Sequence, residues 1–336
     1  MRLLKYLIPV KQNPALHFNP SLIKSAALLF GINPAKITPV RQNHVGVFYI
    51  HEFGYLKIIP ENIMSSNTIS QINQWHMFMH KSNKSIVPLR PSINGKLVEK
   101  ILIDELQFSV KLYKKAPGIQ VTSNVWNEDV MYKIGKLTGK MHRLTKSYNN
   151  YTITTHIADW NDIAEECIGS QIANIDNSVN NRYQNIKKLV SRMQINPDNY
   201  GIIHSDIHRG NILLQTDNEL SLIDFEDTCY SWFANDIANI FYNVLLNTKK
   251  SPTESLSSIN NFKINFWRGY REENIIHPDE LKSIPIWIAF RSLFNYSYLL
   301  KNVENNTTNP THREYFNRNR NLAFEELEKR EPELFL

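Results

Sequence analysis

A short polar loop between two apolar runs holds the residues with the clearest chemical potential in this chain. The stretch is IIHSDIHRGNILL, residues 202–214. Two histidines, an aspartate, an arginine, a glycine and an asparagine fall within eight consecutive residues of it. Asp206 and Asn211 are five residues apart, and thirteen residues later Asp224 ends the apolar run LSLID. Carboxylate and amide oxygens can accept a proton or hold a cation, so the spacing indicates a catalytic site.

The segments around this loop predict a β-hairpin. ILL (212–214) and LSLID (220–224) are strand-like, and the polar turn QTDNE (215–219) lies between them. If the strands pair antiparallel about that turn, Asn211 and Asp224 lie opposite each other at the open end. Two oxygen ligands suit Mg²⁺, with phosphates and water completing its shell. The D-x-x-x-x-N spacing is that of kinase catalytic loops, whose aspartate accepts the proton of the attacking hydroxyl, so the pattern predicts phosphoryl transfer.

The same aspartate has a purely structural interpretation. An aspartate in a turn before a strand is usually a cap, and D-x-x-x-x-N by itself occurs by chance. The full pattern is H-x-D-x-x-x-x-N, followed after thirteen residues by an aspartate that closes an apolar strand. That combination is much more specific and favours a catalytic role.

The first third of the chain is strand-rich. Residues 44–59 predict two strands around a turn, and three further strands are predicted at 86–93, 96–103 and 106–113. Asn94–Gly95 is a strong turn signal between the first two of these three, so we expect a hairpin there.

The remainder of the chain is largely helical, with one inserted hairpin. Over residues 130–144 apolar side chains recur at spacings of 4, 3, 4 and 3, which predicts an amphipathic helix. Shorter helices are predicted at 20–31 and 68–80, and the change of pattern falls near KKAPG (114–118). The predicted fold class is α+β, with a strand-rich domain at 1–110 and a mainly helical domain at 111–336. The family resemblance described below implies that the first binds nucleotide and that the second is the catalytic and substrate-binding domain.

The charge is unevenly distributed although the net charge is only +6. Residues 1–150 contain 20 Lys+Arg and 7 Asp+Glu, whereas residues 151–336 contain 18 and 25. An anion site in one half and a cation site in the other would produce this pattern, and so would a solvated surface with an acidic tail. The chain has no zinc-finger or RNP-type motif and no basic stripe interleaved with aromatics, so we do not expect nucleic-acid binding.

The cysteines and the hydropathy of the sequence indicate in which cellular compartment the protein is expected. Cys167 and Cys229 form no CxxC and no ligand cluster, which fits a reducing, cytoplasmic environment. The most apolar late segment, 284–300, contains Pro285 and Arg291, so we expect a buried or amphipathic helix there and no membrane span.

IIHSDIHRGNILL, LSLIDFED and FANDIANIFY together resemble the aminoglycoside phosphotransferase / choline kinase superfamily, which includes homoserine kinase-like and stress-response kinase-like proteins. The resemblance is strong over 200–242, and weaker echoes in GYLKII, LTGKMHRLTKSY and FWRGY extend it over most of the chain. It implies a two-lobed protein-kinase-like fold with a small antiparallel-sheet lobe and a larger, mainly helical lobe. It also implies the cofactors ATP and Mg²⁺.

The resemblance assigns roles to individual residues. Asp206 resembles the catalytic base, Asn211 and Asp224 resemble the magnesium ligands, and Lys57 in YLKII resembles the lysine that holds the ATP phosphates. The supporting residues would be His204, which opens and braces the loop, His208 within the loop, and Asp236, which ties the loop to the following helix.

The chain departs from the kinase pattern at the partner of Lys57. Active kinases pair this lysine with a helix glutamate, but no acidic residue occurs between Glu61 and Glu99. The remaining candidates are Gln71, Asn73 and Gln74, through neutral hydrogen bonds, and Glu61 from the preceding loop.

The predicted activity is transfer of the γ-phosphate of ATP to a hydroxyl of a small molecule. The acidic C-terminal half favours an amine-bearing acceptor of the aminoglycoside, choline or homoserine type. Two alternatives stay open: a Ser/Thr protein kinase of the stress-response type, and a nucleotide-binding pseudokinase, which the missing glutamate suggests. The intact Asp206, Asn211 and Asp224 argue against the pseudokinase. Arg291 is expected either to brace the large lobe or to contact an anionic substrate group.

Overall fold

The structure, a computed structural model, describes residues 18–42, 44–148, 155–169, 177–247, 252–303 and 310–325. The chain forms two compact units. The first comprises Met1–Ile119, Tyr148–Ile157 and Leu213–Glu226, and the second comprises Gln120–Ser147, Ala158–Ile212 and Asp227–Leu336. Neither unit is continuous in sequence, so the linear domains 1–110 and 111–336 stay a prediction.

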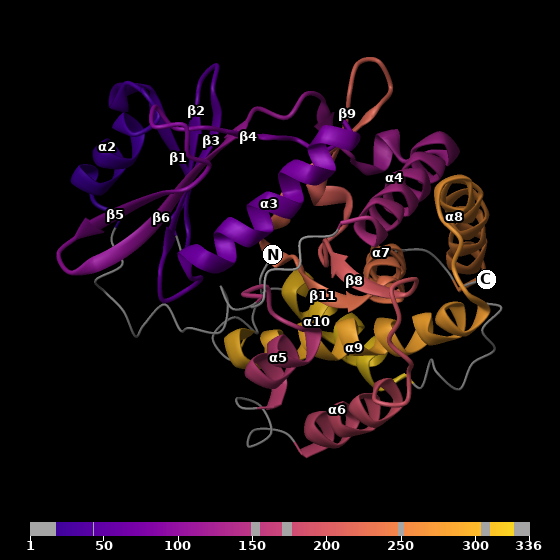
Figure 1. Cartoon of the computed structure of the whole chain (residues 1–336). Coiled ribbons are helices and arrows are strands. Elements are labelled where there is room, and N and C mark those ends of the chain that lie inside the picture. Colours follow the sequence, from indigo (N-terminus) through magenta and orange to yellow (C-terminus); the bar gives the residue numbers. More distant parts are fainter. Residues whose placement is uncertain are drawn as a thin grey trace. The chain divides into compact units, whose positions relative to one another are not determined.

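The first unit is built on an antiparallel sheet (Figure 1). Its strands follow the order β1-β2-β3-β6-β4, and β5 also pairs with β6. The strands are β1 (Ile37–Gln42), β2 (Gly46–Ile50), β3 (Gly54–Pro60), β4 (Leu89–Arg90), β5 (Glu99–Ile103) and β6 (Leu106–Lys114). β2 and β3 are the two strands predicted within 44–59.

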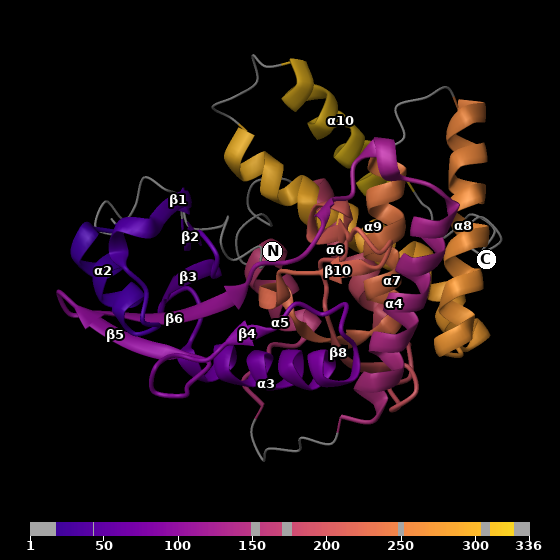
Figure 2. The ribbon, with the colours of Figure 1, turned by 90° about the horizontal axis from the view of Figure 1, so that it is seen from above.

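The two faces of this sheet bury different side chains, because successive residues of a strand point to opposite faces. One face carries Ile58 of β3 and forms an apolar core with α2 (Pro20–Leu28). The other face carries Lys57 and Lys111, and Lys111 contacts α3 (Ser66–Ser82). Figure 2 shows the two helices on opposite sides of β6. The two lysines therefore lie on the face of the sheet that α3 covers.

Helices α2 and α3 both begin at side-chain caps. The Asn19 Oδ1 atom accepts a hydrogen bond from the backbone N–H of Leu22 at 2.8 Å, and the Ser65 hydroxyl accepts one from Thr68 at 3.1 Å. Such caps satisfy amide groups that have no partner in the first helical turn. The predictions at 20–31 and 68–80 identified both helices within a few residues.

The predicted hairpin at Asn94–Gly95 is wrong. β4 and β5 do not pair with each other, because each pairs with a different stretch of β6. Ser92 and Asn94 donate hydrogen bonds to Glu99 at 2.6 and 2.9 Å, so side chains close a local turn there. The hairpin turn is instead Asp104–Glu105, both at positive φ, which joins β5 to β6.

The second unit is mainly helical. Its main helices are α4 (Glu128–Lys146), α5 (Trp160–Ala164), α6 (Asn177–Val190), α7 (Phe233–Asn247), α8 (Pro252–Glu273), α9 (Pro278–Val303) and α10 (Pro310–Phe324). α4 is the helix predicted from the apolar spacings, and it lies beside α8 in both views (Figures 1 and 2). The backbones come very close, since a Cβ atom on Gly135 would lie 1.9 Å from the Phe266 carbonyl oxygen.

Short strands carry the loops on which the predicted site depends. β8 (Tyr200–Ile203) pairs antiparallel with β11 (Cys229–Trp232) in the second unit. β9 (Ile212–Leu214) and β10 (Leu220–Leu222) are neighbours in a small sheet that also contains β7 (Ile119–Gln120). The predicted second strand is two residues longer than β10, because Asp224 adopts the left-handed conformation, with φ +68°, and leaves the strand.

The structure confirms the predicted α+β class: an antiparallel sheet dominates one unit and helices dominate the other. Within the described ranges, no helix combines the length and apolarity that crossing a bilayer requires. Segment 284–300 lies in α9, where Trp287 and Leu293 are fully buried in the protein core.

Candidate active site

The predicted catalytic loop leaves β8 and is held by α7. The carboxylate of Asp236, near the start of α7, accepts hydrogen bonds from the backbone N–H groups of His204 at 3.1 Å and Ser205 at 2.7 Å. Ser205 has φ +64°, a strained conformation for a non-glycine residue, so the loop needs this external support. The predicted role of Asp236 as a structural tie matches these contacts.

Two buried histidines support the same framework. His204 accepts a hydrogen bond at Nδ1 from the backbone N–H of Asp206, at 3.2 Å. His142 on α4 lies with Nε2 3.4 Å from Asp236 and with Nδ1 2.9 Å from the Tyr270 hydroxyl. Burial lowers the pKa of His142, which keeps the imidazole neutral. From the sequence, His142 follows the apolar stripe of this helix and is expected to be a packing residue, because a histidine there has no local signal of a distant partner.

The carboxylate of Asp206 is held in place by contacts with several side chains of the second unit. Arg291 on α9 donates to its Oδ1 atom at 2.7 Å and to the Ser205 carbonyl at 3.2 Å. The Asn211 amide donates to Oδ2 at 3.0 Å, and His208 Nε2 lies 3.5 Å from the same oxygen. Burial alone would raise the pKa of Asp206, but its hydrogen bonds and electrostatic contacts, including those with His208 and Arg291, hold that pKa well below its usual range. Asp206 is therefore a carboxylate that can accept a proton.

We expect Arg291→Lys to lower kcat by about ten- to a hundredfold, because an ammonium cannot serve both oxygens with the fixed fork of a guanidinium. Initial-rate kinetics will measure the loss, with little change in KM for ATP. Arg192→Lys is the matched control, since Arg192 is exposed. An unchanged kcat in Arg291→Lys would show that the contact between Arg291 and Asp206 does not contribute to catalysis.

The predicted nucleotide lysine belongs to a second cluster, in the first unit. Lys57 Nζ lies 3.0 Å from Asp224 Oδ1 and 2.8 Å from Glu226 Oε2. Burial alone would lower the pKa of Lys57, but the two carboxylates raise it above its ordinary value. The structure therefore brings Lys57 and Asp224 together, as the resemblance implies, and adds Glu226.

The partners considered for Lys57 at the sequence level make other contacts. Glu61 accepts a hydrogen bond from the backbone N–H of Ser66, at the start of α3, at 2.8 Å. Gln71 accepts one from the backbone N–H of His156 at 2.6 Å. Asn73 accepts one from Lys111 at 3.4 Å. The acidic partner that replaces them is Glu226, two residues after Asp224 in IDFED. Its position close to a predicted metal ligand was the available sequence signal for a role in the site.

Arg209, within the catalytic loop, stacks on an aromatic ring. Its guanidinium carbon lies 3.7 Å from the centroid of the Trp126 ring. Such contacts stabilise an arginine by cation–π attraction. The guanidinium of Arg209 is therefore held against the Trp126 ring.

Comparisons with known proteins identify the family. The choline/ethanolamine kinase model matches residues 112–270. Amicoumacin kinase of Bacillus subtilis (strain 168) is 30% identical over 253 residues, covering 75% of each chain. The chain belongs to the aminoglycoside phosphotransferase / choline kinase superfamily. The protein is therefore a kinase with an alcohol group as acceptor, which confirms the predicted enzyme class.

Solved structures support the kinase-like fold. An amicoumacin kinase in complex with AMP-PNP, Ca²⁺ and Ami superposes with a TM-score of 0.84 and 26% identity, over 93% of this chain and 95% of that one. A microcompartment-associated aminopropanol kinase superposes with a TM-score of 0.69 and 14% identity, over 91% and 95%. The relatives are small-molecule kinases, which favours the predicted small-molecule acceptor over the protein-kinase and pseudokinase alternatives.

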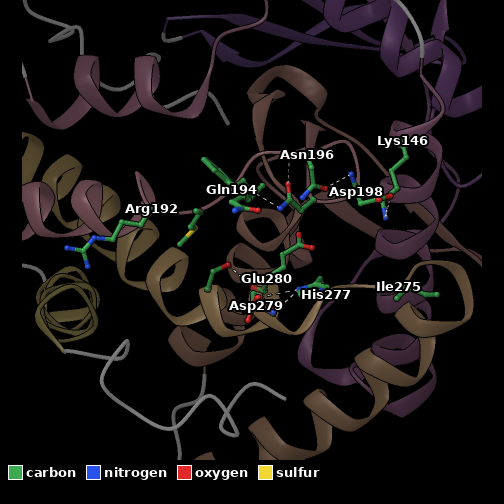
Figure 3. A pocket seen from close by; sticks show the side chains of 13 residues that line it. Lys146, Arg192, Gln194, Asn196, Asp198, Ile275, His277, Asp279 and Glu280 are labelled. Atoms are coloured by element: carbon green, nitrogen blue, oxygen red, sulfur yellow. Dashed lines mark hydrogen bonds and ion pairs between the residues drawn. The ribbon is translucent and has the colours of Figure 1, made fainter.

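This kinase also has a polar cavity of about 920 Å³ in its second unit (Figure 3). Asn199, before the first residue of β8, and Trp232, the last residue of β11, both line it. The catalytic loop follows the other end of β8, roughly 13 Å away for a four-residue strand. The cavity therefore lies away from Asp206. Figure 3 shows Glu280 among its lining side chains.

Glu280 predicts a pH-dependent loss of stability. Burial raises its pKa to about 8, while Oε1 accepts a hydrogen bond from the backbone N–H of Ala234 at 3.0 Å. The unfolded chain releases this proton near the ordinary value of 4.5, so unfolding releases a proton between the two values and stability falls as pH rises. Between pH 5 and pH 8, we expect wild type to lose on the order of 2–4 kcal/mol relative to Glu280→Gln.

Denaturant unfolding of both proteins at the two pH values will measure this difference. Asp279→Asn is the matched control, because Asp279 is an exposed carboxylate at the same cavity and should show no such trend. An equal difference at pH 5 and pH 8 would mean that Glu280 is ionised throughout.

Proposed function

We propose that this kinase uses Mg²⁺ and ATP to phosphorylate a hydroxyl of an amine-bearing small molecule, with an amicoumacin-type compound as the first candidate. The supporting observation is Asp206, a buried carboxylate that is held ionised and oriented by Arg291 and Asn211. The likeness to amicoumacin kinases over most of the chain supports the choice of acceptor. A cytoplasmic location, where ATP is available, completes the proposal; Cys167 and Cys229 are both buried.

The side chains of Asn211 and Asp224 fit a metal ion whose coordination shell is completed by phosphate oxygens. Asn211 donates both its hydrogen bonds from Nδ2, to the backbone and side chain of Asp206, so its Oδ1 atom stays available as a ligand. Asp224 supplies a second carboxylate, whose Oδ1 atom lies 3.0 Å from Lys57 Nζ. Among the described residues no group of three or more His, Cys, Asp or Glu could enclose a metal, which agrees with a site that relies on ligand oxygens.

The proposed mechanism assigns one task to each side chain. A bound metal would supply positive charge that neutralises the charge developing on the phosphates. Asp206 accepts the proton of the acceptor hydroxyl as the hydroxyl oxygen bonds to the γ-phosphorus and the bond from that phosphorus to the β–γ bridging oxygen breaks, which releases ADP. Lys57 binds phosphate oxygens of ATP, and Asn211 and Asp224 are the proposed metal ligands. Asp236 and His204 keep the loop in the conformation that presents Asp206.

A second acceptor class is an amino alcohol such as choline or ethanolamine. The choline/ethanolamine kinase model matches 112–270, which includes the catalytic loop and α7. The two classes differ greatly in size, so turnover can separate them.

Phosphoryl transfer to a panel of acceptors will test the proposal. Purified protein with Mg²⁺·ATP is incubated with amicoumacin, spectinomycin, choline, ethanolamine, 1-amino-2-propanol or a generic protein substrate. Product is detected by mass spectrometry, and Asp206→Asn is assayed in parallel. Acceptor-dependent turnover of an amine-bearing compound that is lost in the variant supports the proposal. Transfer to the protein substrate alone, or turnover that persists in Asp206→Asn, would refute it.

A further inference from the structure

Two buried lysines lie side by side on the sheet of the first unit. Lys57 on β3 and Lys111 on β6 are directly opposed residues of the antiparallel pair, so their side chains share one face. Lys57 is 7% exposed and Lys111 is 1% exposed. Two ammonium groups at such a place repel each other and lose hydration, so buried counter-charges must offset both costs.

One carboxylate reaches both lysines. Glu226 is fully buried; its Oε2 atom lies 2.8 Å from Lys57 Nζ, and its Oε1 atom lies 3.0 Å from Lys111 Nζ. The Tyr113 hydroxyl donates to Oε1 at 2.8 Å. With Asp224 on Lys57, the cluster contains two cations and two anions.

Helix α3 contacts the same cluster through an uncharged side chain. Asn73 Oδ1 accepts a hydrogen bond from Lys111 Nζ at 3.4 Å. The Asn73 Nδ2 atom is buried and makes no hydrogen bond within the described part of the chain. The helix thus presents an amide, one of whose polar atoms is unsatisfied, at a position where a carboxylate oxygen could pair with Lys111.

We propose that Glu226 is the positioning residue for Lys57 in this chain, in place of a glutamate on α3, and that Lys111 and Tyr113 hold Glu226 in position. This inference rests on the proposed role of Lys57 in binding phosphate. Asp224 is also a proposed metal ligand, so its carboxylate would be shared with the metal. Glu226 is therefore the carboxylate that can stay paired with Lys57 while nucleotide and metal bind. Glu226 and Asp224 are two residues apart in one segment, so that segment positions both the lysine and the proposed ligand. The lysine then needs no charged contact from α3.

The arrangement is tested by removing the negative charge at Glu226 and introducing one at Asn73, with substitutions that hardly change side-chain size. Glu226→Gln leaves two buried ammonium groups with Asp224 alone, so we expect the melting temperature to fall by roughly 5–10 °C. We also expect affinity for AMP-PNP, measured by calorimetry, to weaken about tenfold or more because Lys57 loses its orientation. Asn73→Asp in the Glu226→Gln background restores a carboxylate next to Lys111 and should recover at least half of the lost melting temperature.

Lys114→Met is the matched control for this strand. Lys114 is exposed at the end of β6, so its loss should change neither the melting temperature nor AMP-PNP affinity. A kinetic measurement adds a second readout: Glu226→Gln should raise KM for ATP while KM for the acceptor stays unchanged.

The outcomes separate this inference from the proposed function. A Glu226→Gln variant with wild-type melting temperature and AMP-PNP affinity would overturn the inference, and so would a double variant no better than Glu226→Gln. Failure of the wild type to bind AMP-PNP would instead overturn the proposed function. The thermal rescue by Asn73→Asp tests the charge arrangement without any turnover.

Discussion

Replacing Asp206 by asparagine is expected to lower kcat by about 10²- to 10⁴-fold, the usual contribution of a general base. Asparagine has the same shape, and its one side-chain oxygen can still accept the hydrogen bond from Arg291. Its amide nitrogen cannot accept the one from Asn211, and the side chain cannot take the proton of the acceptor hydroxyl. Affinity for Mg²⁺·ATP should change little. Steady-state kinetics with the acceptor found in the panel, together with calorimetry of nucleotide binding, will measure both quantities.

Asp198→Asn is the matched control for this variant. The Asp198 side chain is 92% exposed and lies in the same unit, so kcat should stay at the wild-type value. If Asp206→Asn instead lost nucleotide binding and kept kcat at saturating ATP, Asp206 would be a binding residue and the assignment of the base would be wrong.

Replacing Asp224 by asparagine is expected to lower kcat/KM for ATP by about a hundredfold or more, because a neutral amide holds Mg²⁺ poorly and less charge on the phosphates is neutralised. Among the described residues of the first unit, the variant leaves Glu226 as the remaining carboxylate that pairs with Lys57. The diagnostic measurement is the Mg²⁺ concentration that gives half-maximal rate, which should rise strongly.

The same hairpin offers a control for this change. Asp217 lies in the exposed turn between β9 and β10, so Asp217→Asn should leave the Mg²⁺ dependence unchanged. An Asp224→Asn variant that needs no additional Mg²⁺ and keeps its rate would remove Asp224 from the metal site.

Local sequence patterns predicted several of these elements well. The catalytic loop, its flanking strands and α4 were predictable because their periodicity and polar spacing extend over fewer than twenty consecutive residues. The Asn94–Gly95 signal predicted a turn correctly but the wrong strand neighbours, since β4 and β5 both bind β6. Turn chemistry is local, whereas strand order depends on which edges are available in the assembled sheet.

The partners of the site residues could not be predicted from spacing. Arg291 contacts Asp206 across 85 residues of sequence, and Glu226 contacts Lys57 across 169. An arginine in an apolar helix indicated that some partner was needed, but any carboxylate on a neighbouring element would have satisfied that need. His142 and Lys111 gave no signal at all, because a buried polar residue is identified by its surroundings.

The sequence by itself predicted which side chains would perform phosphoryl transfer: residue type and spacing indicate Asp206, Asn211 and Asp224, and the family resemblance adds Lys57. The tertiary structure decided how two of them are held, Asp206 by Arg291 and Lys57 by Glu226 rather than by a helix glutamate. The physical reason is that a buried charge must find its counter-charge in space, and packing brings together residues that are far apart in the chain.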